Sequence, residues 1–229
     1  MLAGRAIADE LMDADDLAPE TYTTVMHDLA RVNTLTLARR PTLAFVKRLA
    51  QARPTRLKIL DVGFGDGDML RAIWQWADRA KVNVELVGID LNPRSAVAAR
   101  GATPEPIKID WRTGDYADLA GQGWDAIVSS LVAHHMSHEQ LVAFLRFMNA
   151  EAERGWLIND LHRHGFAYFG YPLLAMLARW HPIVRHDGRL SIARSYRPRE
   201  WLPILAEAGV DNAHVFRAFP FRLCVERRR

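Results

Sequence analysis

The segment LKILDVGFGDGD, residues 57–68, decides the fold of this chain. Its first four residues predict a short buried strand. Asp61 follows, glycines occupy the alternate positions 63, 65 and 67, and a helical pattern covers residues 69–80. Glycine lets a backbone turn sharply and approach a ligand closely. A strand, a glycine-rich turn and a helix N-terminus therefore predict a cradle for a nucleotide-type ligand.

Strand-like and helix-like segments alternate from residue 57 to residue 158, which predicts an α/β fold with a mainly parallel, doubly wound sheet. Further strands are expected at residues 82–89, 106–109, 124–129 and 155–158, and further helices at residues 93–100, 138–152 and 199–208. Two closing strands at 214–219 and 221–226, joined tightly at Pro220, favour an antiparallel edge.

About 55 residues, mostly helical in pattern, precede the cradle. Helices are expected at residues 6–12 and 21–39 and from Pro41 to Leu49, with a break at 53–55. That is more chain than a strand-first domain needs. We therefore expect a helical lid at residues 1–54 and a ligand-binding domain at residues 55–229, with a substrate-cap insertion at about 161–195.

The bulk composition sets limits on the class of protein. The chain has 49% hydrophobic residues, a formal charge of +3 and a pI of about 9.2. This charge is too small to indicate a nucleic-acid-binding protein, and none of the apolar stretches is long enough to span a bilayer. Cys224 is the only cysteine, so no internal disulfide can form, which suits a reducing cytoplasm.

The glycine spacing and the neighbouring acids limit the classes of ligand that the turn could bind. The pattern is GxGxG, one residue shorter than the dinucleotide fingerprint GxGxxG. Asp61, Asp66 and Asp68 would repel a pyrophosphate but tolerate a ligand that carries a positive charge. S-adenosylmethionine has a sulfonium and an α-amino group and no phosphate, so it fits this pattern.

Two further acids follow later strands. Asp90 ends the second strand, where a carboxylate accepts hydrogen bonds from both ribose hydroxyls; the alternative is a helix cap before Asn92. Asp115 follows the third strand, where an adenine amino group could donate to it; the alternative is an ordinary loop aspartate.

The ordered motifs resemble those of class I S-adenosylmethionine-dependent methyltransferases of the small-molecule, natural-product type. The resemblance covers about residues 40–229 and rests on DVGFGDG at 61–67, GID at 88–90, GD at 114–115 and DAIVSS at 125–130. It implies a Rossmann-like seven-stranded sheet of order 3-2-1-4-5-7-6 with the last strand antiparallel. The cofactor-binding residues implied are Asp61, Gly63, Phe64, Gly65, Asp90, Leu91, Asp115, Tyr116 and Ser130. Phe64 departs from the family, in which a small residue or cysteine is common there.

Histidines supply the candidate catalytic groups. The stretch LVAHHM, residues 131–136, resembles the segment after the fourth strand of small-molecule methyltransferases. Imidazole near neutral pH can accept the proton of a phenol or hydroxyl as its oxygen attacks the methyl group. His135 and His162 are the candidate bases and His134 a candidate substrate-binding residue. The alternative is that these histidines only hydrogen-bond the scaffold.

No metal ligand set is expected. Catechol-type methyltransferases hold Mg²⁺ with an aspartate after the fourth strand and an Asp-Asn pair after the fifth. Here Ser129 and Ser130 end the fourth strand, and the pair Asn159–Asp160 is reversed.

The insertion after the fifth strand is unusually aromatic. Its apolar side chains, with Tyr168 and Tyr171 as candidate substrate contacts, suit either a flat apolar acceptor or the partner in a homodimer. The alternative is an ordinary buried helix.

The sequence thus predicts a cytoplasmic, metal-independent methyltransferase that acts on a small, aromatic or apolar acceptor. O-methylation is the first choice, in a setting such as secondary metabolism. Methylation of RNA or protein is a second hypothesis, although no Asn-Pro-Pro-Tyr-type motif is present. A third is a cofactor-binding partner protein without catalysis.

Overall fold

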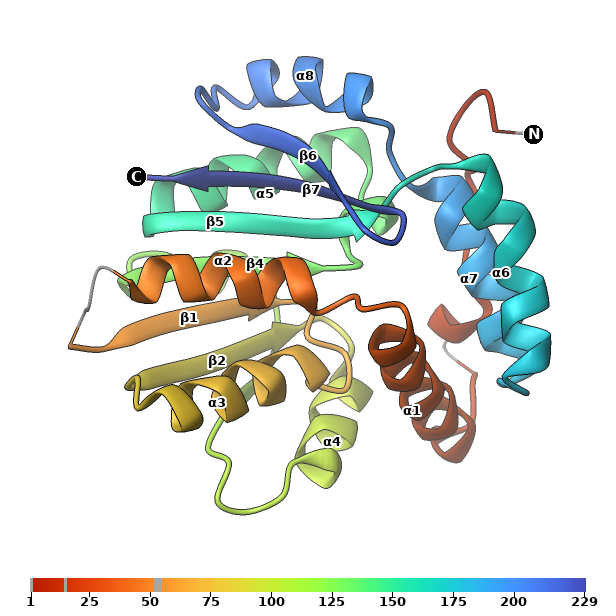
Figure 1. Ribbon diagram of the computed structural model, residues 1–229, viewed down its shortest axis with the longest axis horizontal. Coiled ribbons are helices and arrows are strands. Elements are labelled where there is room, and N and C mark those ends of the chain that lie inside the picture. The colour runs from red at the N-terminus through yellow and green to blue at the C-terminus, as the bar shows by residue number, and fades with distance from the viewer. Residues whose placement is uncertain (1, 15, 52–54) are drawn as a thin grey trace.

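A seven-stranded sheet forms the centre of the computed structural model, which describes residues 2–14, 16–51 and 55–229. The strand order β3-β2-β1-β4-β5-β7-β6 confirms the predicted topology (Figure 1). β7 runs antiparallel to both of its neighbours, and the other pairs are parallel. The strands are β1 (Leu57–Val62), β2 (Val84–Asp90), β3 (Asp110–Thr113), β4 (Trp124–Ser130), β5 (Ala152–Leu161), β6 (His214–Ala218) and β7 (Arg222–Arg228).

Helices cover both faces of the sheet. They are α1 (Pro19–Leu35), α2 (Arg40–Ala50), α3 (Asp68–Ala80), α4 (Pro93–Ala102), α5 (His138–Glu151), α6 (Gly165–Leu177), α7 (Pro182–Arg194) and α8 (Pro198–Glu207). The side chains of α2, α3 and α4 pack on one face of the sheet and those of α5 and α8 on the other. Successive residues of a strand point to opposite faces, so Leu57 and Ile59 join the first layer and Leu60 and Val62 the second.

The predicted third strand was misplaced. β3 is Asp110–Thr113, not residues 106–109, and Asp110 pairs with Val87. Pro104 and Pro106 lack the backbone N–H that a sheet ladder needs, and the N–H of Ile107 instead bonds the carbonyl of Pro104 in a turn.

The helix predicted at residues 6–12 is also absent. Only a short 3₁₀ helix, η1 (Leu11–Asp13), forms there. The backbone N–H groups of this segment are used by α7 instead: Ala6 donates to the carbonyl of Ala193, and Leu11 and Met12 donate to the carboxylate of Asp187. Tertiary contacts have replaced the local helical ladder.

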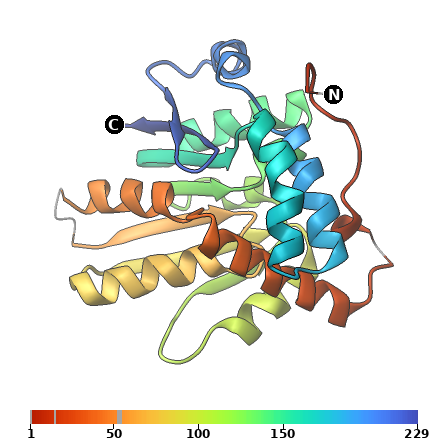
Figure 2. The same cartoon turned by 45° about the vertical axis from the view of Figure 1, so that its right-hand side comes forward.

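A third apolar cluster lies beside the sheet, where α1, α6 and α7 meet. It joins Val25 and Val32 of α1 to Ala175 of α6 and Val184 of α7. Figures 1 and 2 show these three helices beside the edge at which the parallel strands end. The region expected to form the lid and cap therefore combines an N-terminal helix with two helices from the insertion after β5.

The predicted division between lid and ligand-binding domain has a boundary at residues 52–54, which lie outside the described residues. α2 belongs to the layer on the sheet, because Phe45, Val46 and Leu49 pack in the same cluster as β1. α1 and the segment before it contribute to the cap. Among the described residues, no helix is long and apolar enough to cross a membrane.

Candidate functional site

The turn after β1 is an open glycine cradle. Gly63, Gly65 and Gly67 all have positive φ, at 75°, 59° and 80°, a region in which a side chain is strained. A Cβ at Gly63 would lie 2.3 Å from Val132, and one at Gly67 would lie 2.2 Å from the ring of Trp111. Glycine is therefore required at these positions both by the backbone and by the neighbours.

Carboxylates lie around this turn, and few cationic or hydrogen-bonding partners offset their negative charge. Asp61 is 1% exposed, and within the described residues its Oδ1 atom has no hydrogen-bond partner. Burial, with the nearby charges of Asp68 and Asp90, raises the pKa of Asp61 well above its usual range. Burial and the charge of Asp66 raise that of Asp68 as well. Asp66 is itself paired with Arg71 at 2.9 Å. The site therefore favours a cationic ligand.

Asp90 ties the end of β2 to the glycine turn. Its Oδ2 accepts from the N–H of Gly65 at 3.0 Å and its Oδ1 from the N–H of Asn92 at 2.9 Å. Burial raises its pKa despite these two bonds. Asn92, not Asp90, caps α4, by accepting from the N–H of Arg94.

The other predicted cofactor residues have varied surroundings. The ring of Phe64 packs on Trp111 at 4.8 Å and lies in the core. Tyr116 packs against Phe144 and Phe147 of α5. Asp115 is exposed and accepts from the N–H of Ala117, so it caps a short 3₁₀ helix.

Leu91 and Ser130 complete the predicted set. The side chain of Leu91 is 74% exposed beside the glycine turn, at the end of β2. Ser130 ends β4, and its hydroxyl lies 3.4 Å from that of Thr42 on α2.

A buried histidine–aspartate pair joins the ends of β4 and β5. The backbone N–H of His134 donates to Asp160 Oδ2 at 2.8 Å, and Nδ1 of its ring lies 2.7 Å from Oδ1. Burial lowers the pKa of His134, but the charge and hydrogen bond of Asp160 outweigh it and raise the pKa to about 9. For Asp160, burial raises the pKa, but His134 outweighs it and lowers the pKa.

Glu10, from the N-terminal segment, is a second carboxylate next to the ring of His134. Its Oε1 lies 3.6 Å from Nε2 of His134 and accepts from the hydroxyl of Ser191 at 2.6 Å. Glu10 is 4% exposed, and contacts with His134 and His135 lower its pKa although burial raises it. The sequence reasoning missed Glu10. Nothing local marks it, because its partners are far away in the chain.

The two candidate bases differ in exposure. The side chain of His135 is 31% exposed and its ring packs, tilted by 40°, against that of His134 with 4.2 Å between the centroids. Its Nδ1 lies 3.4 Å from the carboxylate of Asp13. His162 is 6% exposed, and burial with the charge of Arg217 lowers its pKa to about 4. Within the described residues no hydrogen bond joins His135 to His162.

The predicted substrate contacts also have defined neighbours. The hydroxyl of Tyr171 donates to the carbonyl of Val184 at 2.9 Å, so Tyr171 holds α6 to α7. Tyr168 lies under the guanidinium of Arg189, at 4.4 Å.

Glu10, His134 and His135 offer ligand-type atoms that lie within 4.8 Å of one another. An imidazolium of His134 held between two carboxylates accounts for this grouping as an ion-pair network. The reversed Asn159–Asp160 pair does not point at a common site either, because Asn159 donates to the carbonyl of Ala38 while Asp160 bonds His134.

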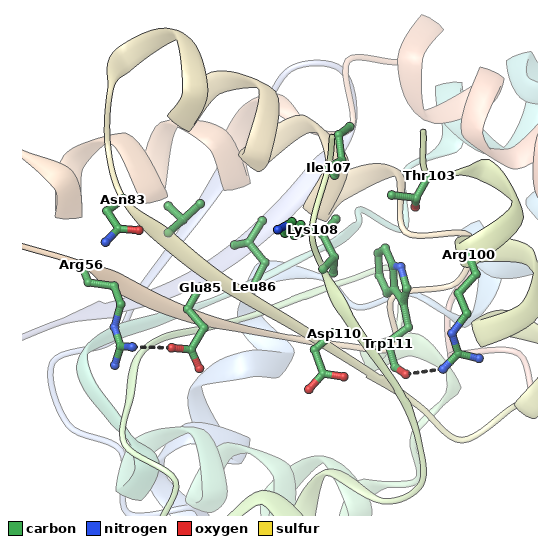
Figure 3. Close-up of a pocket in the computed structure, with 12 residues that line it drawn as sticks. Arg56, Asn83, Glu85, Leu86, Arg100, Thr103, Ile107, Lys108, Asp110 and Trp111 are labelled. Carbon is green, nitrogen blue, oxygen red and sulfur yellow. Dashed lines mark hydrogen bonds and ion pairs between the residues drawn. The ribbon is translucent and has the colours of Figure 1, made fainter. Parts of the chain in front are cut away.

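A broad hollow of about 810 Å³ lies elsewhere, along the first residues of β2 and β3 (Figure 3). Arg56 and Glu85 form an ion pair at 2.7 Å on its wall, and Arg100 bonds the carbonyl of Trp111. It contains none of the predicted site residues. Ligands of open α/β sheets bind at the carboxyl ends of the strands, so the glycine cradle remains the candidate functional site.

Residues 59–153 match the protein family described as "Methyltransferase domain". The match contains the glycine turn, Asp90, Asp115 and the His134–His135 segment. The match identifies a methyltransferase domain within this chain, and the sheet order agrees with the predicted fold of class I S-adenosylmethionine-dependent methyltransferases. The prediction of the enzyme class is confirmed. No curated protein matches the sequence.

Solved structures share the fold. The plantazolicin methyltransferase BpumL, in complex with a triazolic desmethylPZN analogue and SAH, has a TM-score of 0.63 and 14% identity over 89% of this chain and 90% of that one. Human N-acetylserotonin methyltransferase, in complex with SAM, has a TM-score of 0.65 and 13% identity over 93% of this chain and 56% of that one. Magnesium protoporphyrin IX methyltransferase from Synechocystis PCC 6803, with bound SAH, has a TM-score of 0.55 and 16% identity over 94% of this chain and 89% of that one. At these identities the likeness establishes the fold only.

Proposed function

We propose that this chain transfers the methyl group of S-adenosylmethionine to a small aromatic or apolar acceptor, with oxygen as the acceptor atom. The cofactor assignment is based on the buried Oδ1 atom of Asp61 beside the glycine turn, which has no hydrogen-bond partner within the described residues. A buried carboxylate without compensation costs free energy unless a cation pairs with it. The cofactor supplies such a cation, and its sulfonium makes the methyl group electrophilic.

Each predicted residue then has a defined task. Asp61, Gly63 and Gly65 hold the methionine part and Asp90 the ribose. Asp115 and Tyr116 would hold the adenine, Leu91 and Ser130 would line the cofactor site, and Phe64, which packs on Trp111, would support the turn. Because the electrophile is already activated, holding the acceptor in line supplies much of the rate.

We assign the binding of the acceptor and the removal of its proton to the cap and the histidines. His135 and His162 are the candidate bases, and His134, Tyr168 and Tyr171 contribute to the wall around the acceptor. The lowered pKa of His162 keeps it neutral at pH 7, although it is then a weak base. The lid at residues 1–54 and the cap at about 161–195 would exclude water. A homodimer through the exposed side of α6 is an alternative use of the insertion.

The aromatic side chains Tyr168 and Tyr171 of α6 support an aromatic or apolar acceptor. Two of the similar structures, one bound to a triazolic desmethylPZN analogue and one an N-acetylserotonin methyltransferase, are consistent with such an acceptor. A place in secondary metabolism fits this range of acceptors.

The test is a screen with S-adenosylmethionine labelled in its methyl group. Phenols, aromatic acids and amines form the panel, and cofactor binding is measured by calorimetry on the same preparation. We expect a labelled product from a phenolic acceptor. Cofactor binding without any product across the panel would instead favour a non-catalytic partner protein, and label transferred to RNA or protein would favour the macromolecular alternative.

A further inference from the structure

An unpartnered apolar face runs along α6. Five large side chains point to solvent there, with exposed fractions between 54% and 79%: Phe166, Phe169, Leu173, Met176 and Leu177. Their spacing of three or four residues places them on one side of the helix. Figure 2 shows α6 on the outside of the molecule, in front of α7. No fold requirement explains this exposure, because α6 holds the cap together through its other side, at Ala175.

The apolar face continues onto the β6–β7 turn. His164 stacks on Phe166 at 5.7 Å and on Phe221 at 5.2 Å. Phe219 of the same turn is 79% exposed. A shallow hollow of about 560 Å³ lies between Phe166 and Phe169. We name the five α6 side chains with Phe219 and Phe221 the α6 surface.

The chain segments that carry and flank the α6 surface are rich in arginine and poor in acids. No acid occurs at residues 161–186, 188–199 or 212–225. Asp187, between the first two of these ranges, is 2% exposed and is engaged by the N–H groups of Leu11 and Met12. The exposed arginines of these segments are Arg179, Arg185, Arg189, Arg197, Arg199 and Arg217.

These arginines are placed around the surface. Arg179 lies two residues after the last residue of α6, and the guanidinium of Arg189 lies over the ring of Tyr168 of α6. Arg217 and Arg197 are close enough to depress the pKa of His162, beside the His164–Phe221 stack. The apolar side chains therefore have cationic neighbours at both ends of the helix and on the α7 side.

We propose that the α6 surface docks on an anionic lipid membrane. Apolar side chains of a surface helix enter the boundary between headgroups and acyl chains, and flanking arginines pair with anionic headgroups. A second copy of this chain is the less favourable occupant, because it would bring like charges together around the contact. The docking itself does not depend on the proposed reaction. If the reaction stands, docking would bring the cap against a bilayer, from which an amphiphilic acceptor could enter.

The test is sedimentation of the protein with vesicles. Phosphatidylglycerol-rich vesicles are compared with pure phosphatidylcholine vesicles, at about 0.05 M and about 0.5 M salt. Leu177→Glu is the test variant, and Val97→Glu on α4 is the matched control, because both side chains are 71% exposed. Arg179→Gln with Arg185→Gln tests the charge contribution. Cofactor affinity by calorimetry and oligomeric state by light scattering are measured for every variant.

We expect the wild-type protein to sediment with the anionic vesicles and to be released by salt. Leu177→Glu should weaken this binding by about tenfold or more, since a leucine-sized apolar contact is lost, and Val97→Glu should not change it. Both variants should keep the cofactor affinity, which separates this test from that of the proposed function. Absence of binding at low salt, equal loss in the control, or a wild-type dimer that Leu177→Glu dissociates without any vesicle binding would each overturn the proposal.

Discussion

His134 and Asp160 share two hydrogen bonds across the ends of β4 and β5, one through the imidazole and one through the backbone N–H of His134. Both side chains are almost fully buried, at 2% and 3% exposure. The pair fixes the loop that carries His135 to the strand that leads into α6. It thereby sets the position of the proposed acceptor side of the site.

Removing one member of this pair should destabilise the folded protein. Asp160→Asn should lower the free energy of unfolding by about 3–5 kcal/mol, because a buried imidazolium loses its counter-charge. Urea denaturation measures the change. Asp118→Asn, at an exposed position, is the control and should stay within about 0.5 kcal/mol of wild type. Similar values for both variants would show that the pair does not hold the loop.

The same pair predicts a pH dependence. The pKa of His134 is raised in the folded state, from 6.5 to about 9, so the folded protein binds this proton more tightly than the unfolded chain does. The contribution to stability is therefore fully present below pH 6.5 and is lost as the pH rises through 9. The stability difference between wild type and His134→Gln should shrink across this interval. An NMR titration of His134 with a midpoint near 6.5 would contradict the assignment directly.

Replacing Gly67 and Gly101 by alanine should change the stability of the fold in opposite directions. Gly67→Ala should destabilise the fold by about 1–3 kcal/mol, because φ is 80° and the new Cβ would meet the ring of Trp111. Gly101→Ala should stabilise it by up to about 1 kcal/mol, since Gly101 is within α4 and nothing lies within 4 Å of its Cβ position. Thermal unfolding measures both. The prediction fails if both substitutions have the same sign.

Asp90→Ala should weaken cofactor binding by roughly 100-fold, as expected for the loss of charge-assisted hydrogen bonds to the ribose and to the N–H of Gly65. Calorimetry provides the measurement, and Asp118→Ala is the matched acidic control nearby. Asp90→Asn keeps one acceptor oxygen and should fall between the two. Unchanged affinity in Asp90→Ala would remove the ribose assignment.

Glutamine variants of His135 and His162 should identify the base. The variant that removes it should lower kcat by about 10²- to 10⁴-fold with cofactor affinity unchanged. If the base is His162, with its pKa lowered to about 4, the rate should rise with pH through 4 and stay level near neutrality. His138→Gln is the control, because His138 is exposed and pairs with Glu207. Wild-type rates in both test variants would assign both histidines to the scaffold.

The sequence predicted the elements whose signals are local. Alternating apolar segments and the glycine turn predicted the mainly parallel sheet and the antiparallel edge, because periodicity and turn chemistry act within a few residues. The strand order came from the resemblance to a known family. The errors occurred where neighbours decide the conformation. Residues 106–109 have the apolar character of a strand, but Pro106 lacks the backbone N–H that strand pairing needs. Residues 6–12 do not form the predicted helix, because their backbone groups bond α7 instead.

The opening segment 57–68 by itself determined the cradle, its need for glycine and its preference for a cationic ligand over a phosphate. Only the tertiary structure decided which acids remain unpaired, since Asp66 meets Arg71 while Asp61 meets no partner within the described residues. It also decided that Glu10 reaches His134, across more than half the chain. Burial and charge pairing are properties of the folded arrangement, and no local sequence pattern encodes which distant side chain completes a buried pair.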